Sequence, residues 1–105
     1  MLPKKQRFGH FNINEFLKRA SRRENDFFSV WFAPNTIDCS RFAAAPPKTN
    51  FKKATERNKI KRRVYNAIKI NIDRIKKGDY FIRPKTAAAK ATNQELADKI
   101  LKLFW

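Results

Sequence analysis

Apolar residues recur at helical spacing through the middle of the chain. With positions set about 100° apart, one sector holds aliphatic side chains, namely Ile60, Val64, Ala67, Ile68 and Ile75. A second sector is polar and partly cationic, and it holds Asn58, Arg62, Tyr65 and Lys69. The pattern predicts one long helix over 55–77, with Thr55 as its N-cap and Gly78 just beyond its end. One face would pack on a core, and the other would present a cationic stripe.

Two shorter amphipathic segments lie nearer the ends of the chain. Asn12 and Glu15 resemble a capping box for a first helix, whose apolar stripe is Ile13, Phe16, Leu17 and Ala20. The far end of this helix is cationic, which suits its C-terminal dipole, through Lys18, Arg19, Arg22 and Arg23. Thr92 and Glu95 form a second capping box. It opens a last helix with the apolar residues Leu96, Ile100, Leu103 and Phe104.

Aromatic and branched residues predict strands between the helices. The run 27–33 reads as a strand with Phe28, Val30 and Phe32 on one face and Phe27, Ser29 and Trp31 on the other. Turn residues at 34–38 lead to a returning strand at 41–45, and a third strand covers 80–82. Residues 85–90 read as an alanine-rich connection. The predicted order, α-β-β-α-β-α, indicates an α+β fold, a two-layer sandwich of helices on a small mixed sheet.

The charge of the chain points to a polyanionic partner. The 105 residues hold 25 Lys or Arg against 9 Asp or Glu, which gives a net charge of +16. Eight of the sixteen residues at 48–63 are Lys or Arg, and this run would suit phosphate, since binding to it releases counterions. A basic helix face is more often merely solvated, but here the excess extends over the whole chain. The length favours a single domain, 1–105, with a flexible basic arm at 1–11.

Catalytic and metal-binding patterns are missing from the sequence. His10 is the sole histidine, Cys39 is the sole cysteine, and the acids are scattered singly. We therefore expect no catalytic residue and no metal site on this protein. A lone cysteine and no secretory signal favour a cytoplasmic protein, and no run is apolar enough to span a membrane. Among the aromatic residues, Phe16 and Trp31 are candidates for stacking on unpaired bases, with core packing as the alternative.

The run Ala54-Thr55-Glu56-Arg57-Asn58-Lys59-Ile60-Lys61-Arg62-Arg63 resembles the signature of the bacterial ribonuclease P protein component, E-R-N-R-I/V-K-R at the start of a long helix. The flanks are similar as well. Leu2-Pro3 to Arg7-Phe8 resembles the basic arm of that family, and Asn14-Glu15-Phe16 its first helix. Asp79-Tyr80 resembles the start of a late strand.

The resemblance implies a fold like the second domain of ribosomal protein S5 and a subunit that assists a catalytic RNA. In that family the RNA and its Mg²⁺ hydrolyse precursor tRNA, and the protein holds the 5′ leader in a cleft between sheet and first helix. By position, contacts to the RNA would come from Arg57, Asn58, Lys59, Lys61 and Arg62, and the basic run adds Lys48, Lys52 and Lys53. The leader-binding residues would be Phe16, Trp31 and Lys48.

The chain departs from the family pattern in several places. Lys59 stands where the signature has its second Arg, which keeps the charge and loses the planar fork. Ala20 replaces a second aromatic residue, and 43–47 replaces a branched strand. The expected partners are the ribonuclease P RNA and precursor tRNA, without DNA, membrane or an obligate protein partner. The alternatives are a structural RNA-binding protein such as a small ribosomal protein, an autonomous nuclease, and a membrane-surface protein.

Overall fold

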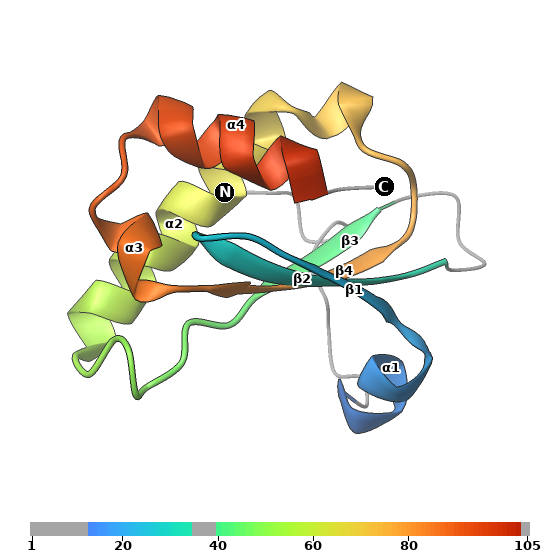
Figure 1. The fold of residues 1–105 in the computed structure, drawn as a ribbon, viewed down its shortest axis with the longest axis horizontal. Coiled ribbons are helices and arrows are strands. Elements are labelled where there is room, and N and C mark those ends of the chain that lie inside the picture. Colours follow the sequence, from blue (N-terminus) through green and yellow to red (C-terminus); the bar gives the residue numbers. More distant parts are fainter. Residues whose placement is uncertain (1–12, 35–39, 104–105) are drawn as a thin grey trace.

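The fold is a four-stranded mixed sheet with helices on both faces (Figure 1). The computed structural model describes residues 13–34 and 40–103. In sheet order β1-β2-β4-β3, the strands are Ser21–Glu24, Phe28–Ala33, Asp79–Pro84 and Arg41–Ala44. One face of the sheet carries α2 (Ala54–Ile70), α3 (Thr86–Ala89) and α4 (Asn93–Leu103). The helix α1 (Ile13–Arg19) lies on the opposite face.

The strand predicted at 41–45 is present as β3, but its partner differs from the expected one. It was expected to return beside 27–33, and the structure instead pairs it in parallel with β4. β4 lies between β2 and β3 and runs antiparallel to β2. A parallel neighbour requires a crossover, which α2 supplies between β3 and β4. The mixed character of the sheet is therefore confirmed, with a different strand order.

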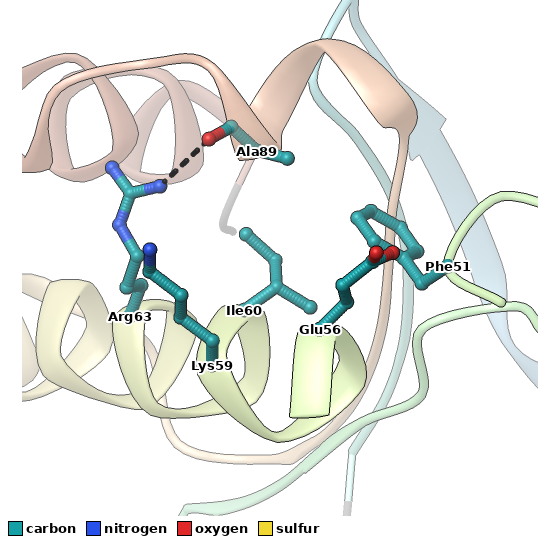
Figure 2. A pocket seen from close by; sticks show the side chains of 6 residues that line it. All are labelled: Phe51, Glu56, Lys59, Ile60, Arg63 and Ala89. Carbon is teal, nitrogen blue, oxygen red and sulfur yellow. Dashed lines mark hydrogen bonds between the residues drawn. The ribbon is translucent and has the colours of Figure 1, made fainter. Parts of the chain in front are cut away.

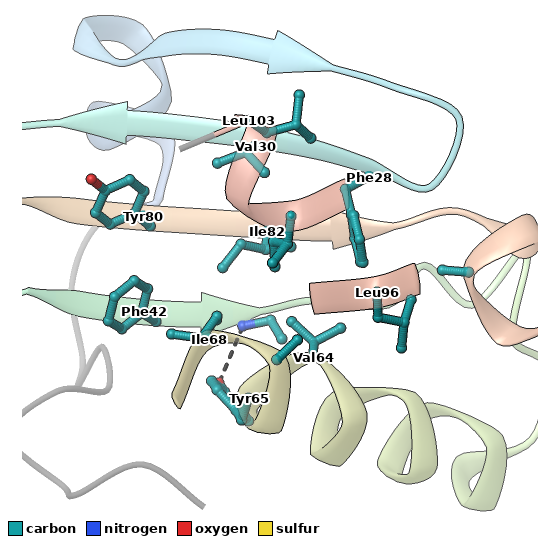
Figure 3. Packing of buried hydrophobic residues seen from close by; sticks show 14 of the residues in the cluster. Phe28, Val30, Phe42, Val64, Tyr65, Ile68, Tyr80, Ile82, Leu96 and Leu103 are labelled. Carbon is teal, nitrogen blue, oxygen red and sulfur yellow. Dashed lines mark hydrogen bonds between the residues drawn. The ribbon is translucent and has the colours of Figure 1, made fainter. Parts of the chain in front are cut away.

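The main core lies between the sheet and the three helices on its first face (Figure 3). The predicted alternation is confirmed within β2, since Phe28, Val30 and Phe32 all point into this core. Phe27 was predicted on the opposite face with Trp31, but it precedes β2 and packs against the main core. The aliphatic sector of the central helix is also buried, as Ile60, Val64, Ala67, Ile68 and Ile75. At roughly 1.5–3 kcal/mol for each buried aliphatic side chain, this sector fixes α2 firmly on the sheet.

The central helix is shorter than the sequence predicts. It ends at Ile70, and a 3₁₀ helix, η2 (Ile72–Arg74), follows. The buried side chain of Asn71 explains the end, because its Nδ2 donates to the carbonyls of Ala67 and Ala97, both at 3.1 Å. The amide thereby ties the end of α2 to α4.

Two residues of the central helix have other roles than expected. The N-cap position is Lys53, without a side-chain cap, so the prediction of Thr55 as N-cap was wrong. Tyr65 is only 7% exposed and does not belong to the polar stripe. Its hydroxyl accepts the N–H of Ala44 at 3.1 Å, which joins α2 to β3 (Figure 3).

Gly78 was predicted to lie just beyond the end of the central helix. The structure places it directly before β4 instead. A Cβ atom at this position would lie 2.9 Å from Cζ of Phe32, closer than side chains pack. The close approach of the Phe32 ring therefore requires glycine here.

The edge strand β1 has no counterpart among the elements predicted from the sequence. Arg22 and Arg23 were assigned to the cationic end of the first helix, but this helix ends at Arg19. Asn25 makes the turn to β2, because its Oδ1 accepts the N–H groups of Phe27 and Phe28, both at 2.9 Å. Its Nδ2 also donates to the carbonyl of Lys99 in α4.

The second capping box is confirmed. The N–H of Glu95 donates to Oγ1 of Thr92, and the N–H of Thr92 donates to the Glu95 carboxylate, both at 3.1 Å. The hydrogen bond from the N–H of Thr92 is the main cause that lowers the pKa of the Glu95 carboxyl, and the Thr92 side chain adds to it. Within the predicted connection 85–90, the structure has the short helix α3.

Several sequence predictions concern residues outside the described ranges. These are the arm at 1–11, the cap at Asn12, most of the turn at 34–38, Cys39 and Phe104. Within the described ranges, no helix is both long enough and apolar enough to cross a membrane.

Candidate nucleic-acid interface

The first turns of α2 and the loop before it carry most of the predicted RNA-binding residues on the surface. The exposed residues of this set are Lys48, Lys52, Lys53, Asn58, Lys59 and Arg62. Arg57 and Lys61 are half-buried. These residues surround α2 on several sides, so they do not form one flat stripe.

On one side of α2, part of the set lines a shallow hollow of about 310 Å³. Lys48, Arg57, Asn58 and Lys61 lie around it. Its remaining wall is the end of β3 and the two residues after it, namely Ala44, Ala45 and Pro46. The structure thus brings Lys48 close to the signature residues, although ten positions separate it from Asn58.

Arg57 has a structural role as well as a charge. Its Nη1 donates to the carbonyls of Phe51 at 2.8 Å and Lys52 at 3.0 Å. These bonds hold the loop before α2, and with it Lys52 and Lys53, beside the helix N-terminus. The unpaired N–H groups of that terminus already favour anions.

Lys59 and Arg62 lie on other sides of α2. Lys59 lines a pocket with Glu56, Ile60 and Arg63 (Figure 2). Arg62 lines a third hollow, between α2 and the start of α4, with Arg63 and Asn66. The structure therefore separates Arg57, Asn58 and Lys61 from Lys59 and from Arg62.

Arg63 joins α2 to the C-terminal part of the chain. Its guanidinium donates to Oδ1 of Asn93 at 3.0 Å and to the carbonyl of Ala89 at 3.2 Å, and it also donates to the carbonyl of Ala91. Carbonyls at the end of α3 need such donors. We conclude that this arginine of the basic run positions α3 and α4.

A row of side chains crosses the second face of the sheet, next to α1. The register aligns Arg22 of β1 with Trp31 of β2, Trp31 with Phe81 of β4, and Phe81 with Ala43 of β3. Trp31 is half-buried, as the alternation predicts for the face away from the main core. Its ring contacts Phe81 edge-on at 5.7 Å between centroids, and the guanidinium carbon of Arg22 lies 5.1 Å from the centroid of the indole.

Phe16 is less accessible than a stacking residue should be. Its side chain is 0% exposed, and it packs with Ala33 and Phe81 in a small second cluster beneath α1. The guanidinium carbon of Arg19 lies 5.6 Å from the centre of its ring. This position favours the alternative of core packing. Stacking of a base on Phe16 remains a prediction that would require α1 to move.

Glu24 gathers cations at the edge of the sheet. Its carboxylate accepts from Lys85, from Arg22 at 3.2 Å and from the hydroxyl of Ser29 at 3.4 Å. The ammonium of Lys85 is the main cause that lowers the pKa of the Glu24 carboxyl, and Arg22 and Ser29 add to it. The pairs are exposed, so they orient Arg22 and Lys85 more than they stabilise the fold.

Three residues of this face were not candidates from the sequence: Arg22, Arg83 and Lys85. Arg83 pairs with Ser29 in the register, and its side chain is exposed. The alternation of the strand at 80–82, continued by one residue, could have placed Arg83 with Phe81. Arg22 gives no such signal, because its position depends on the pairing of β1 with Trp31.

The two surfaces meet at the end of β3. Ala43 and Ala45 pack beside the second cluster, and Ala45 also lines the hollow that holds Lys48 and Asn58. A ligand lying along the second face of the sheet would therefore reach the signature residues without leaving the surface. The side chains of Ala43 and Ala45 are small, so they do not obstruct a ligand between the two surfaces.

Within the described residues, no three His, Cys, Asp or Glu side chains come together as metal ligands would.

The fold and its cations define a class of small basic α+β proteins with a charged central helix beside an open sheet face. The family model for Ribonuclease P matches residues 2–105, and the chain belongs to this family. The ribonuclease P protein component of Chromobacterium violaceum is 34% identical over 83 residues, covering 79% of this chain and 69% of that protein. The component of Pseudoalteromonas translucida is 30% identical over 93 residues, covering 89% and 66%.

Solved structures of the family share the fold. The RNase P protein of Thermotoga maritima superposes with a TM-score of 0.79 at 28% identity, covering 87% of this chain and 86% of that one. The RNase P protein of Staphylococcus aureus gives a TM-score of 0.79 at 24% identity, covering 95% and 98%. The family and the fold class expected from the sequence are thereby confirmed.

Proposed function

We propose that this protein is the RNA-binding subunit of a ribonuclease P ribonucleoprotein, which removes the 5′ leader of precursor tRNA. In this proposal the signature residues in the first turns of α2 bind the catalytic RNA, and the second face of the sheet, next to α1, binds the leader. The RNA and its Mg²⁺ perform the hydrolysis, so the protein contributes affinity and position. Cytoplasmic location and endonuclease activity of the assembly belong to the same proposal.

One observation supports this division most directly, namely the continuity of the two surfaces at Ala45. A single-stranded leader needs flat rings for its bases and cations for its phosphates. The row from Arg22 to Ala43 provides both, with Trp31 at its centre. The leader would end where the signature residues begin, so one strand could touch both surfaces.

The charge of the chain explains why such binding would be strong and sensitive to salt. A net charge of +16 opposes a compact protein through self-repulsion, and a polyanion relieves it. Each phosphate neutralised by a cation releases counterions, which makes affinity fall steeply with salt.

Reconstitution with a bacterial ribonuclease P RNA tests the proposal. We would measure cleavage of precursor tRNA at low Mg²⁺ and moderate salt, with the protein alone and the RNA alone as controls. The expected result is stimulated cleavage at the mature 5′ end, with no activity from the protein alone. Tight RNA binding without stimulation would favour a structural RNA-binding protein, and cleavage by the protein alone an autonomous nuclease.

Replacing Arg62 by alanine should weaken binding to the catalytic RNA and reduce the salt slope by about one unit, because one phosphate contact is lost. Arg62 is exposed on α2 and is not needed for the core. The measurement is the affinity as a function of salt concentration. Arg74→Ala removes the same charge from η2 and serves as the control. Equal slopes for Arg62→Ala and the unmodified protein would exclude a phosphate contact.

A further inference from the structure

The pocket beside the first turns of α2 has an apolar floor and charged ends (Figure 2). Figure 2 shows Phe51 and Glu56 at one end, Lys59 and Arg63 at the other, and Ile60 between them. Ala89 of α3 closes the far side. The volume is about 180 Å³. This is below the roughly 300–1,000 Å³ typical of sites for drug-sized ligands, so it suits a single ring system.

The walls of this pocket are held in place. Arg63 donates to the carbonyl of Ala89 at 3.2 Å, which spans the space between α2 and α3. On the other side, Arg57 fixes the carbonyl of Phe51 at 2.8 Å. Phe51 and Ile60 are each 2% exposed and belong to the main core. A ligand would therefore meet a preformed site.

The polar groups at the two ends are complementary to a nucleobase. In the described part of the chain, neither the Glu56 carboxylate nor the Lys59 ammonium has a hydrogen bond or an ion pair. A carboxylate accepts from an exocyclic amine such as N4 of cytosine, and an ammonium donates to ring nitrogens or carbonyl oxygens. Adenine, cytosine and guanine each present such a donor next to an acceptor. Uracil has no exocyclic amine, and its ring donor, N3–H, lies between two carbonyls that would face the carboxylate unfavourably.

We propose that this pocket receives one unpaired adenine, cytosine or guanine of the RNA that the signature residues bind. The inference rests on the proposed function and adds a base-specific contact to it. The pocket lies beside the signature residues, since Lys59 of the signature lines it, and Arg57, on the same turns of α2, lines the neighbouring hollow that holds Lys48. The surrounding charge favours a polyanion as the source of the base.

The sharpest test is a change of charge for which the pocket proposal and general electrostatics predict opposite changes in the affinity for RNA. Glu56→Ala raises the net charge of +16 by one unit, so charge alone would tighten RNA binding. A base in the pocket loses its acceptor, and affinity for the catalytic RNA should instead fall roughly fivefold or more. Asp73→Ala makes the same charge change in η2, away from the pocket, and should not weaken binding. Tighter binding by both variants would overturn the proposal.

A second pair of variants fills the pocket without changing charge. Ala89→Leu places a larger side chain in the space, and Ala87→Leu places it on an exposed position of the same helix, outside the pocket. We expect weaker binding of the catalytic RNA, again about fivefold, for the first alone. Circular dichroism and thermal unfolding establish that both variants fold. If Ala89→Leu fails to fold, the Glu56 pair decides the question.

Photocrosslinking identifies the occupant. A benzophenone amino acid at position 87, which lies on the same helix and leaves the pocket unfilled, should crosslink to one unpaired A, C or G in the complex of the full chain with a ribonuclease P RNA. Mapping is by primer extension. Crosslinks spread over many nucleotides, or to a second copy of the protein, would contradict a base site. Stimulation of cleavage by the wild-type protein is measured in parallel. Stimulation without a specific crosslink would contradict the pocket proposal alone, whereas a lack of stimulation would contradict the proposed function.

Discussion

Replacing Trp31 by alanine should weaken binding of precursor tRNA with a 5′ leader about tenfold, while binding of mature tRNA stays unchanged. Stacking of a base on an aromatic ring contributes about 1–3 kcal/mol, and Trp31 presents the largest ring on the second face of the sheet. The guanidinium of Arg22 lies over the same indole and would lose this cation–π contact. The measurement is the affinity of the assembled ribonucleoprotein for both RNAs.

Phe27→Ala provides a matched control for this experiment. Phe27 is also half-buried and also has a cation near its ring, Lys99 at 5.7 Å, but it packs against the main core. The Phe27→Ala variant should lose a comparable apolar area, but its affinity for precursor tRNA should not fall more than its affinity for mature tRNA. If Trp31→Ala weakens both RNAs equally, Trp31 acts only in packing.

Replacing Arg41 by alanine should lower the free energy of unfolding by about 3 kcal/mol, because a buried carboxylate loses its bidentate partner. Nε and Nη2 of Arg41 donate to the two carboxylate oxygens of Asp79 at 2.8 and 2.7 Å. The side chain of Asp79 is 0% exposed, and that of Arg41 is 31% exposed. Both residues begin their strands, and they are register partners in the parallel pair. Their ion pair therefore also aligns β3 with β4.

Urea unfolding measures this effect, with Arg22→Ala as the control. Arg22 forms an exposed ion pair with Glu24, which should contribute less than about 1 kcal/mol. Arg41→Lys should give an intermediate loss, because an ammonium keeps the charge without the planar fork. Equal stability of Arg41→Ala and Arg22→Ala would show that Asp79 is stabilised by other groups.

Local patterns predicted those elements whose contacts repeat at short spacing. The alternation from Phe28 to Phe32 placed the core face of β2 and the opposite face of Trp31. The sector from Ile60 to Ile68 placed the buried side of α2. The capping box of Thr92 and Glu95 placed the start of α4. In each case the decisive neighbours are within four residues, so a single sequence contains the information.

The candidate site was predicted in part for the same reason. Asn58, Lys59 and Arg62 of the signature are exposed as expected, since each is placed by its position on one helix. Phe16 was expected to line a cleft, and the structure buries it completely. Tyr65 was assigned to the polar stripe, and the structure turns it toward Ala44. A helical wheel cannot distinguish these outcomes, because they depend on which strand lies opposite.

The sequence by itself determined the basic character of the protein, its family signature, its helical faces and the strand that carries Trp31. Only the tertiary structure decided that β1 exists, that β3 pairs in parallel with β4, and that Ala45 joins the sheet face to the signature residues. The physical reason is that strand pairing and burial are set by partners far apart in the chain. Their register appears only when the sheet is assembled.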